Sequence, residues 1–141
     1  MTELAWMQQW YALCDKWRDQ GYDALTADEK VWFTIRALID LTENGGIVGY
    51  YCNSGADHVD DCMAALDRLG AHDVRHQVER VNALFGEGVA DFYRRNQIIS
   101  SWPDDDERFD KFLDEVDNRL FSMFPDLEER LERFLQNAGL I

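Results

Sequence analysis

The sequence predicts an all-α fold, a single-domain bundle of six to seven helices over residues 1–141. Three observations carry this prediction. Apolar residues recur at helical spacing along most of the chain, and no alternation of period two extends beyond about five residues. Pro103 and Pro125 are the two prolines, so few positions resist a helix. A length of 141 residues with 46% hydrophobic content suits one domain with a packed core.

The first predicted helix covers residues 2–20 and ends at Gly21, where glycine can adopt a positive φ. Trp6, Trp10 and Trp17 are spaced by four and seven residues, which places them on one helix face. We expect this face to enter the core. A dimer seam is the alternative, because a chain of this length has limited interior for three indole rings on one helix.

The second predicted helix begins at a capping box, in which the Thr26 hydroxyl accepts from the Glu29 amide and the Glu29 side chain returns to Thr26. It ends at Gly45 and Gly46. The third predicted helix is stopped by Gly70. The third, fourth and fifth helices are expected at about residues 57–69, 73–85 and 89–99.

The last third of the chain predicts two amphipathic helices, Asp104–Met123 and Asp126–Asn137. In each of them, apolar side chains recur at spacings of three and four residues and form one inward face. Pro125 is expected to separate the two helices, because proline lacks an amide hydrogen and fits best in the first turn of a helix.

Acidic residues dominate the charge. The chain has 28 Asp and Glu against 14 Lys and Arg, a net charge of −14, and residues 100–141 hold 12 of the acidic and 5 of the basic side chains. A phosphate backbone and an anionic membrane both attract basic surfaces, so we expect neither direct nucleic-acid binding nor membrane binding. The sequence shows no signal peptide and no membrane-spanning apolar run, which predicts a cytoplasmic protein.

Carboxylates recur on one face of the Asp104–Met123 helix, at spacings of four, four and three residues from Asp106 onward. Like charges at these spacings repel by a few tenths of a kcal/mol per pair, so folding does not require them. The helix macrodipole favours anions at the helix start, which gives part of the cluster a structural reason. Glu128 and Glu132 repeat the like-charge spacing. The candidate partner-binding residues are Asp104, Asp105, Asp106, Asp110, Asp114, Asp117, Glu128 and Glu132.

Two interpretations of this acidic face stay open. It is either the solvated surface of a protein from an acidic proteome, or an imitation of a nucleic-acid backbone. One helical stripe carries a carboxylate about every 5.4 Å, whereas duplex DNA carries one charge per about 1.7 Å of axis. Mimicry would therefore need two or three acidic rows side by side, or a dimer that joins them.

Residues suited to metal binding form no recognised motif. His72, His76 and Glu79 share helical spacing, as do His58 and Cys62, but a metal site needs three or four converging ligands. We interpret them as surface or capping residues. The sequence therefore predicts no metal, no cofactor and no enzymatic activity.

A motif after the second predicted helix carries a family resemblance. Together with the stretch from Thr26 to Phe85, it resembles a bacterial DNA-mimic protein family with the signature NGG-x(3)-Y-x(2)-NS, although Ile47 and Gly49 depart from the usual Phe and Gln. The resemblance implies an all-helical cytoplasmic domain without known catalysis, a homodimer, and an acidic surface that occupies the DNA-binding site of a transcription factor. The matching residues are Asn44, Gly45, Gly46, Tyr50, Asn53, Ser54 and, further on, Gly70.

The matched motif itself is expected to be structural. Gly45 and Gly46 should form a turn, Tyr50 should pack in the core, and Asn53 or Ser54 should cap the next helix. The acidic residues lie outside the motif.

The sequence as a whole predicts an acidic protein-interaction domain that occupies the nucleic-acid-binding face of a basic DNA-binding protein or transcription factor. The alternative is a shape-specific scaffold or immunity-type binding protein whose acidity is incidental. Salt separates the two, because only the first should bind with a steep dependence on ionic strength. A cryptic metal-dependent enzyme is the remote alternative, which metal analysis of the purified protein tests.

Overall fold

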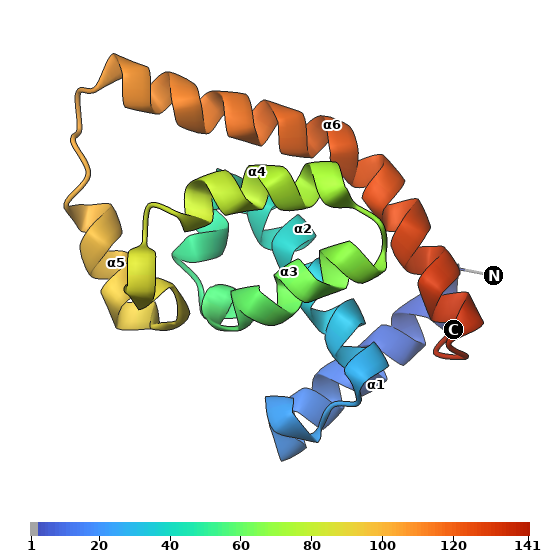
Figure 1. The fold of residues 1–141 in the computed structure, drawn as a ribbon. Helices are drawn as coiled ribbons and strands as arrows, with labels where there is room; N and C mark the ends of the chain where they lie inside the picture. The colour runs from blue at the N-terminus through green and yellow to red at the C-terminus, as the bar shows by residue number, and fades with distance from the viewer. Residues whose placement is uncertain (1–2) are drawn as a thin grey trace.

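The computed structural model describes residues 3–141 of the chain, with side chains described from Trp6 onward. This part contains six α-helices, three short 3-10 turns and no strand, which confirms the predicted all-α class (Figure 1). The 3-10 turns are Tyr22–Ala24, Ser54–His58 and Gly86–Ala90. The α-helices are α1 (Glu3–Gln20), α2 (Ala27–Tyr51), α3 (Val59–Arg68), α4 (His72–Asn82), α5 (Phe92–Ser100) and α6 (Glu107–Asn137).

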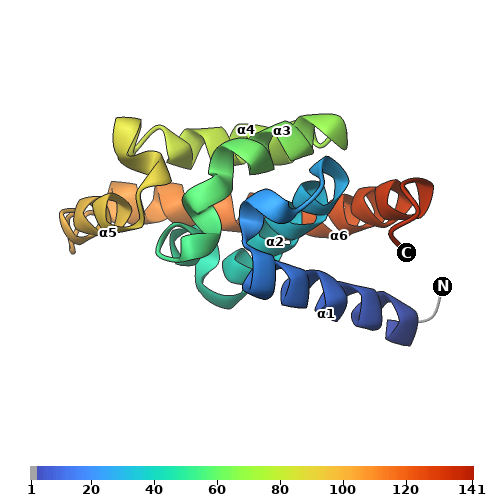
Figure 2. The ribbon, with the colours of Figure 1, turned by 90° about the horizontal axis from the view of Figure 1, so that it is seen from below.

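Helix α2 lies at the centre of the fold. It contacts α3 and α6, and α4 packs against both α3 and α6. Figure 2 shows α3 and α4 on one side of α2 and α1 on the other. Because neighbours cover α2 on several sides, Trp32, Ile35 and Leu38 are almost completely buried.

The indole face of α1 enters the core only in part. Trp6 and Trp10 are partly buried, with their ring centroids 6.1 and 5.4 Å from that of Trp32. Trp17 remains 42% exposed, although its ring lies 5.4 Å from Phe33. The core prediction is therefore confirmed for the first two indoles and wrong for Trp17, which packs on the outer side of the partly buried Phe33.

The glycine pair forms the predicted turn, but α2 continues beyond it. Gly45 has φ −154° and ψ 20°, Gly46 has φ 71° and ψ 180°, and the chain is helical again from Ile47. The Gly46 conformation is one that glycine almost alone adopts. The capping box at the start of α2 is confirmed, since Glu29 N donates to Thr26 Oγ1 at 3.1 Å and Thr26 N donates to Glu29 Oε1 at 2.8 Å.

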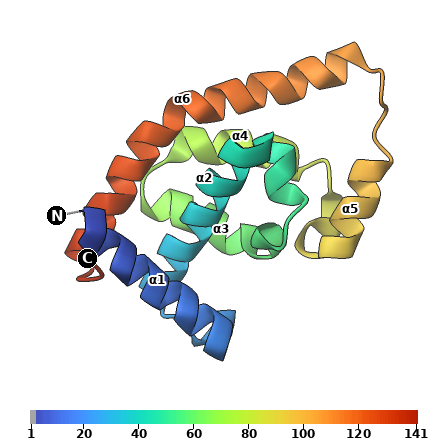
Figure 3. The ribbon, with the colours of Figure 1, turned by 180° about the vertical axis from the view of Figure 1, so that it is seen from behind.

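The prediction that Pro125 separates two helices is wrong. Helix α6 is one helix of 31 residues with Pro125 inside it. An interior proline costs roughly 3 kcal/mol, because it removes an amide donor and crowds the preceding turn. Phe124 and Leu127 flank the proline and are buried, and their burial offsets this cost. Figures 1 and 3 show the resulting long helix curving around the outside of α2 and α4.

Candidate interaction surface

The continuous α6 brings most of the predicted carboxylates onto one face. At about 100° per residue, ideal helix geometry places five of them within a sector roughly 60° wide. At about 1.5 Å per residue, they extend over about 33 Å of helix axis. We call these five the acidic stripe: Asp110, Asp114, Asp117, Glu128 and Glu132.

The basic residues of α6 lie on a different flank, which begins about 60° beyond the acidic stripe. Two of its three carboxylates are paired with arginines. Glu115 pairs with Arg119 at 3.1 Å and with Arg80 of α4 at 3.4 Å, and Asp126 pairs with Arg130 at 2.7 Å. Glu129, on the same side, makes no ion pair among the side chains described. We call this side the mixed flank; it contains Arg108, Lys111, Glu115, Arg119, Asp126, Glu129, Arg130 and Arg133.

The N-terminal end of α6 gathers four predicted carboxylates around one shallow hollow of about 390 Å³. Asp104 and Asp105 come from the link before the helix, and Asp110 and Asp114 from its first turns. All four are exposed, and none makes an ion pair among the described residues. Lys111 lines the same hollow but is paired with Glu107 at 3.0 Å.

Asp106 has a structural task as the N-cap of α6. Its carboxylate accepts the backbone amide of Phe109 at 3.0 Å, which satisfies a donor that the first helical turn leaves unpaired. The predicted helix start at Asp104 therefore moves to Glu107, and Asp106 serves the fold while its side chain remains exposed.

Asp117 also serves the fold. Its Oδ1 accepts from the backbone N of Ile47 at 2.8 Å, so it satisfies an amide at the point where α2 resumes after the glycine turn. A Cβ on Gly46 would lie 2.7 Å from Asp117 Oδ2, so glycine is needed for this approach. Partial burial raises the pKa of Asp117, the hydrogen bond from Ile47 opposes the rise, and the neighbouring Asp114 adds to it.

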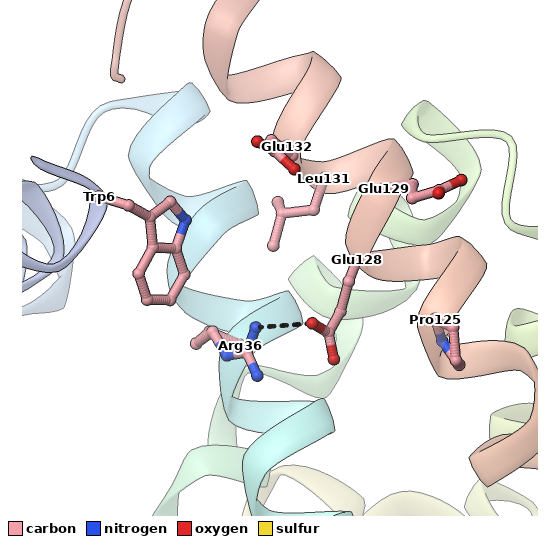
Figure 4. A pocket seen from close by; sticks show the side chains of 7 residues that line it. All are labelled: Trp6, Arg36, Pro125, Glu128, Glu129, Leu131 and Glu132. Carbon is pink, nitrogen blue, oxygen red and sulfur yellow. Dashed lines mark ion pairs between the residues drawn. The ribbon is translucent and has the colours of Figure 1, made fainter. Parts of the chain in front are cut away.

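Glu128 and Glu132 line a second hollow, between α1, α2 and α6 (Figure 4). Figure 4 shows Glu128 pointing from α6 toward Arg36, and Glu132 further along the same helix, near Leu131. Arg36 NH1 lies 4.0 Å from Glu128 Oε2, at the limit of an ion pair. Glu132 makes no ion pair among the side chains described from Trp6 onward.

Sequence reasoning missed a second acidic row, which α2 contributes beside the stripe. Asp40 accepts from Arg36 at 2.7 Å, and both Asp40 and Glu43 are exposed. Burial would lower the pKa of Arg36, but Asp40, Glu128 and Glu43 outweigh it and raise that pKa. The Arg36 guanidinium lies 2.7 Å from Asp40 and 4.0 Å from Glu128. The signal available in the sequence is the three-residue spacing of Asp40 and Glu43, on the side of α2 that carries Arg36.

The motif residues build the scaffold under this surface. Tyr50 is fully buried and lies edge-on to Tyr51, and Gly70 ends α3 with φ 71°, as expected. The expected capping of the next helix by Asn53 or Ser54 is wrong, because the Asn53 amide instead donates back to the Gly49 carbonyl at 2.6 Å.

A buried arginine that the sequence did not single out holds the end of the motif. Arg95 of α5 has no exposed surface and donates to four oxygen acceptors from three other segments. These are the carbonyls of Tyr51 (2.9 Å), Asn53 (2.9 Å) and Val89 (2.8 Å) and the carboxylate of Asp57 (2.7 Å).

The alternative sites do not assemble in the described residues. His58 stacks on Tyr22 with ring centroids 3.5 Å apart, Cys62 is fully buried, and His72 lies 3.6 Å from Asp67. No group of three or more His, Cys, Asp or Glu side chains in this part of the chain is placed to hold a metal ion. Among the helices described, none has the length and apolar character to cross a membrane.

Comparison with known proteins agrees with the motif. A family model described as DMP19-like protein matches residues 23–138, which include the whole motif and the whole acidic stripe. No curated protein and no solved structure gives a significant match.

Proposed function

The chain belongs to the DMP19-like protein family, and from this membership we propose that it acts as a DNA mimic, a protein that occupies the DNA-binding face of a basic DNA-binding protein. The residues that we assign to this contact are the acidic stripe, the adjoining Asp104 and Asp105, and the second row formed by Asp40 and Glu43. In this proposal, Asp106 is a supporting residue at the edge of the surface.

The observation that carries the proposal is the separation of charge on α6. Glu115 and Asp126 of the mixed flank are paired with arginines, whereas Asp110, Asp114 and Glu132 of the stripe make no ion pair among the side chains described. The stripe is about as long as one turn of duplex DNA, which advances roughly 34–36 Å. Its length and sign are therefore those that a DNA-binding face accepts.

Charge density argues that α6 does not act alone. Five carboxylates over about 33 Å give one charge per roughly 7 Å, about fourfold sparser than duplex DNA. We infer that Asp104 and Asp105, which line one hollow with Asp110 and Asp114, extend the stripe at its N-terminal end, and that Asp40 and Glu43 of α2 supply a second row.

The mechanism is competition for the same arginines and lysines. A DNA-binding protein uses these side chains to neutralise phosphates, and the carboxylates of the mimic pair with them instead. While the mimic is bound, DNA cannot occupy the same face. Displacement of the ions around both surfaces makes such a complex weaken steeply as salt rises.

The experiment that tests this function is capture from a lysate of the source organism. The immobilised chain should retain a basic DNA-binding protein at low salt, and duplex DNA should displace it. The double variant Asp110→Asn/Asp114→Asn should retain much less of that protein, because it removes two charges from the stripe and leaves the hydrogen bond of Asp117 in place.

The matched control is Asp60→Asn/Asp73→Asn, which changes the net charge equally, from −14 to −12. Asp60 and Asp73 are exposed, lie in the first turns of α3 and α4, and take part in no ion pair that the described chain makes. Equal loss of capture in both variants would mean that the net charge of the protein, and not the position of the stripe, determines binding. A captured protein that DNA does not displace would contradict the mimic function.

A shape-specific scaffold or immunity-type binding protein remains the second candidate. The observation that favours it is an exposed aromatic pair at the start of α5, where Tyr93 is 78% exposed and Phe92 is 37% exposed. A partner that docks there should resist salt, and Tyr93→Ala should weaken its binding more than Asp110→Asn/Asp114→Asn does.

We propose a homodimer as the state in which the chain acts. The exposed Trp17 supports this, because it leaves one indole of the predicted dimer seam on the surface of α1. Light scattering should give the mass of two chains for the wild type, and the mass of one chain for Trp17→Glu. A wild-type mass of one chain at micromolar concentration would contradict the dimer.

A further inference from the structure

The hollow between α1, α2 and α6 combines an aromatic ring with carboxylates. It has a volume of about 500 Å³, within the range of about 300–1,000 Å³ that is usual for small-molecule sites. Three walls of different chemistry meet there (Figure 4). Trp6 provides an indole, Leu131 and Pro125 provide apolar surface, and Glu128 and Glu132 provide negative charge. Arg36 lies beside Glu128.

Arg36 shows which chemistry suits this hollow. Its guanidinium lies 5.8 Å from the Trp6 ring centroid and 4.0 Å from Glu128, so one arginine already contacts both the ring and a carboxylate. A guanidinium suits both partners, since it stacks on aromatic faces and pairs with carboxylates through a planar set of donors.

Arg36 pairs more closely with Asp40 than with the glutamates of the hollow. Its Nε and NH2 both donate to Asp40 Oδ1, at 3.0 and 2.7 Å. The hollow therefore keeps an excess of negative charge, because Glu128 has only the contact at 4.0 Å and Glu132 has no ion pair among the side chains described. This excess of negative charge favours a second cation.

We propose that this hollow receives one arginine side chain of the basic partner. The inference rests on the proposed function and deepens it, since it names a specific contact within the broader electrostatic surface. The guanidinium faces the Trp6 indole and pairs with Glu132 and Glu128, while the aliphatic stem lies along Leu131 and Pro125. Arginine fits better than lysine, whose compact and strongly hydrated ammonium stacks less well.

This contact differs in kind from the rest of the acidic face. A cation that leaves water to stack on a ring inside a hollow contributes more than one paired at an exposed rim. Arginine and tryptophan are also among the residues that most often dominate binding energy at interfaces. The hollow supplies selectivity for one side chain, whereas the stripe supplies long-range attraction.

The test uses N-acetyl-arginine amide as the probe and the ¹⁵N-labelled full chain at low salt. The indole N–H signal of Trp6, assigned by its loss in Trp6→Phe, should shift and saturate as the probe is added. The neutral isostere N-acetyl-citrulline amide should bind about tenfold more weakly, the combined effect of losing one ion pair and one cation–π contact. An equal response to both probes would overturn the proposal.

Two double variants with the same net charge localise the effect. Glu128→Gln/Glu132→Gln should abolish the arginine-specific shift, whereas Asp60→Asn/Asp73→Asn, in the first turns of α3 and α4 and outside the acidic surface, should leave it unchanged. Equal weakening by both would overturn the inference, because general attraction to an acidic protein would then suffice. If the chain still captures a protein that DNA displaces but shows no response to the arginine probe, only this inference fails. If the arginine response is present but no captured protein is displaced by DNA, the proposed function fails.

Discussion

The two sides of α6 use the same residue types in different ways. On the mixed flank, Glu115 and Asp126 sit beside arginines at 2.7–3.4 Å, so most of the charge cancels locally. On the acidic stripe, Asp110 and Asp114 face solvent with no ion pair in the described chain. The positions of the charges therefore indicate a binding surface better than the net charge of −14 does, because one side of α6 has paired charges and the other has unpaired ones.

The acidic stripe also divides into carboxylates that serve the fold and carboxylates that do not. Asp117 holds the restart of α2 through Ile47, whereas the side chains of Asp110 and Asp114 make no hydrogen bond within residues 3–141. Carboxylates that repel one another and make no contact that stabilises the fold are the best candidates for binding. The predictions below test that division, beginning with the largest expected effect.

Substitution of Gly46 by alanine should destabilise the fold by about 3 kcal/mol, because the backbone there is nearly restricted to glycine and the new Cβ would collide with Asp117. Gly45→Ala is the control, with φ −154° and open space around its Cβ, and should cost less than about 1 kcal/mol. Urea denaturation measures both. Similar losses would mean that the contact between the motif and α6 is unimportant.

Asp117→Ala should lower the free energy of unfolding by about 1–2 kcal/mol, because the Ile47 amide loses its acceptor. Asp114→Ala, one turn away and exposed, should stay within about 0.5 kcal/mol of the wild type. The same denaturation series compares them. Equal stability of the two variants would remove the distinction between the structural and the binding carboxylates.

The pH dependence of stability should carry the signature of Asp117. Because burial raises its pKa in the folded chain, the folded state holds this proton more tightly than the unfolded state does. This contribution is present at low pH and is lost as the pH rises through the raised pKa. As the pH falls from 7 to 4, the unfolding free energy of the wild type should therefore rise relative to that of Asp117→Asn. A constant difference between the two proteins would contradict this.

Asp110→Asn/Asp114→Asn should change stability by no more than about 0.5 kcal/mol, since relief of repulsion offsets a small loss at the helix start. Moderate salt should raise the melting temperature of the wild type by screening the same repulsion. The rise should be smaller in this variant than in Asp60→Asn/Asp73→Asn. A melting temperature that is flat or falls with salt would show that self-repulsion does not limit stability.

Much of the fold follows from the sequence because helical periodicity, glycines and caps act locally. The capping box at Thr26 and the turns at Gly45, Gly46 and Gly70 are all present. The errors arise where tertiary contacts override local preference. Pro125 remains inside α6 because buried neighbours hold the helix together.

The candidate surface was predictable only as a list of carboxylates. Spacing finds the stripe, but it cannot tell that Asp117 is turned toward Ile47 or that Asp40 and Glu43 lie beside α6. Arg95 escaped prediction for a similar reason, since nothing local separates a buried arginine from the exposed Arg94 next to it. Such roles depend on which helices meet, and periodicity does not encode that.

The most direct test of the central claim is the salt dependence of binding to the protein captured from the lysate. The account predicts a steep fall in affinity with rising salt for the wild type and for Asp60→Asn/Asp73→Asn. It predicts weaker binding and a shallower slope for Asp110→Asn/Asp114→Asn. Equal slopes for all three proteins, or a slope near zero for the wild type, would contradict the claim that the acidic stripe stands in for DNA.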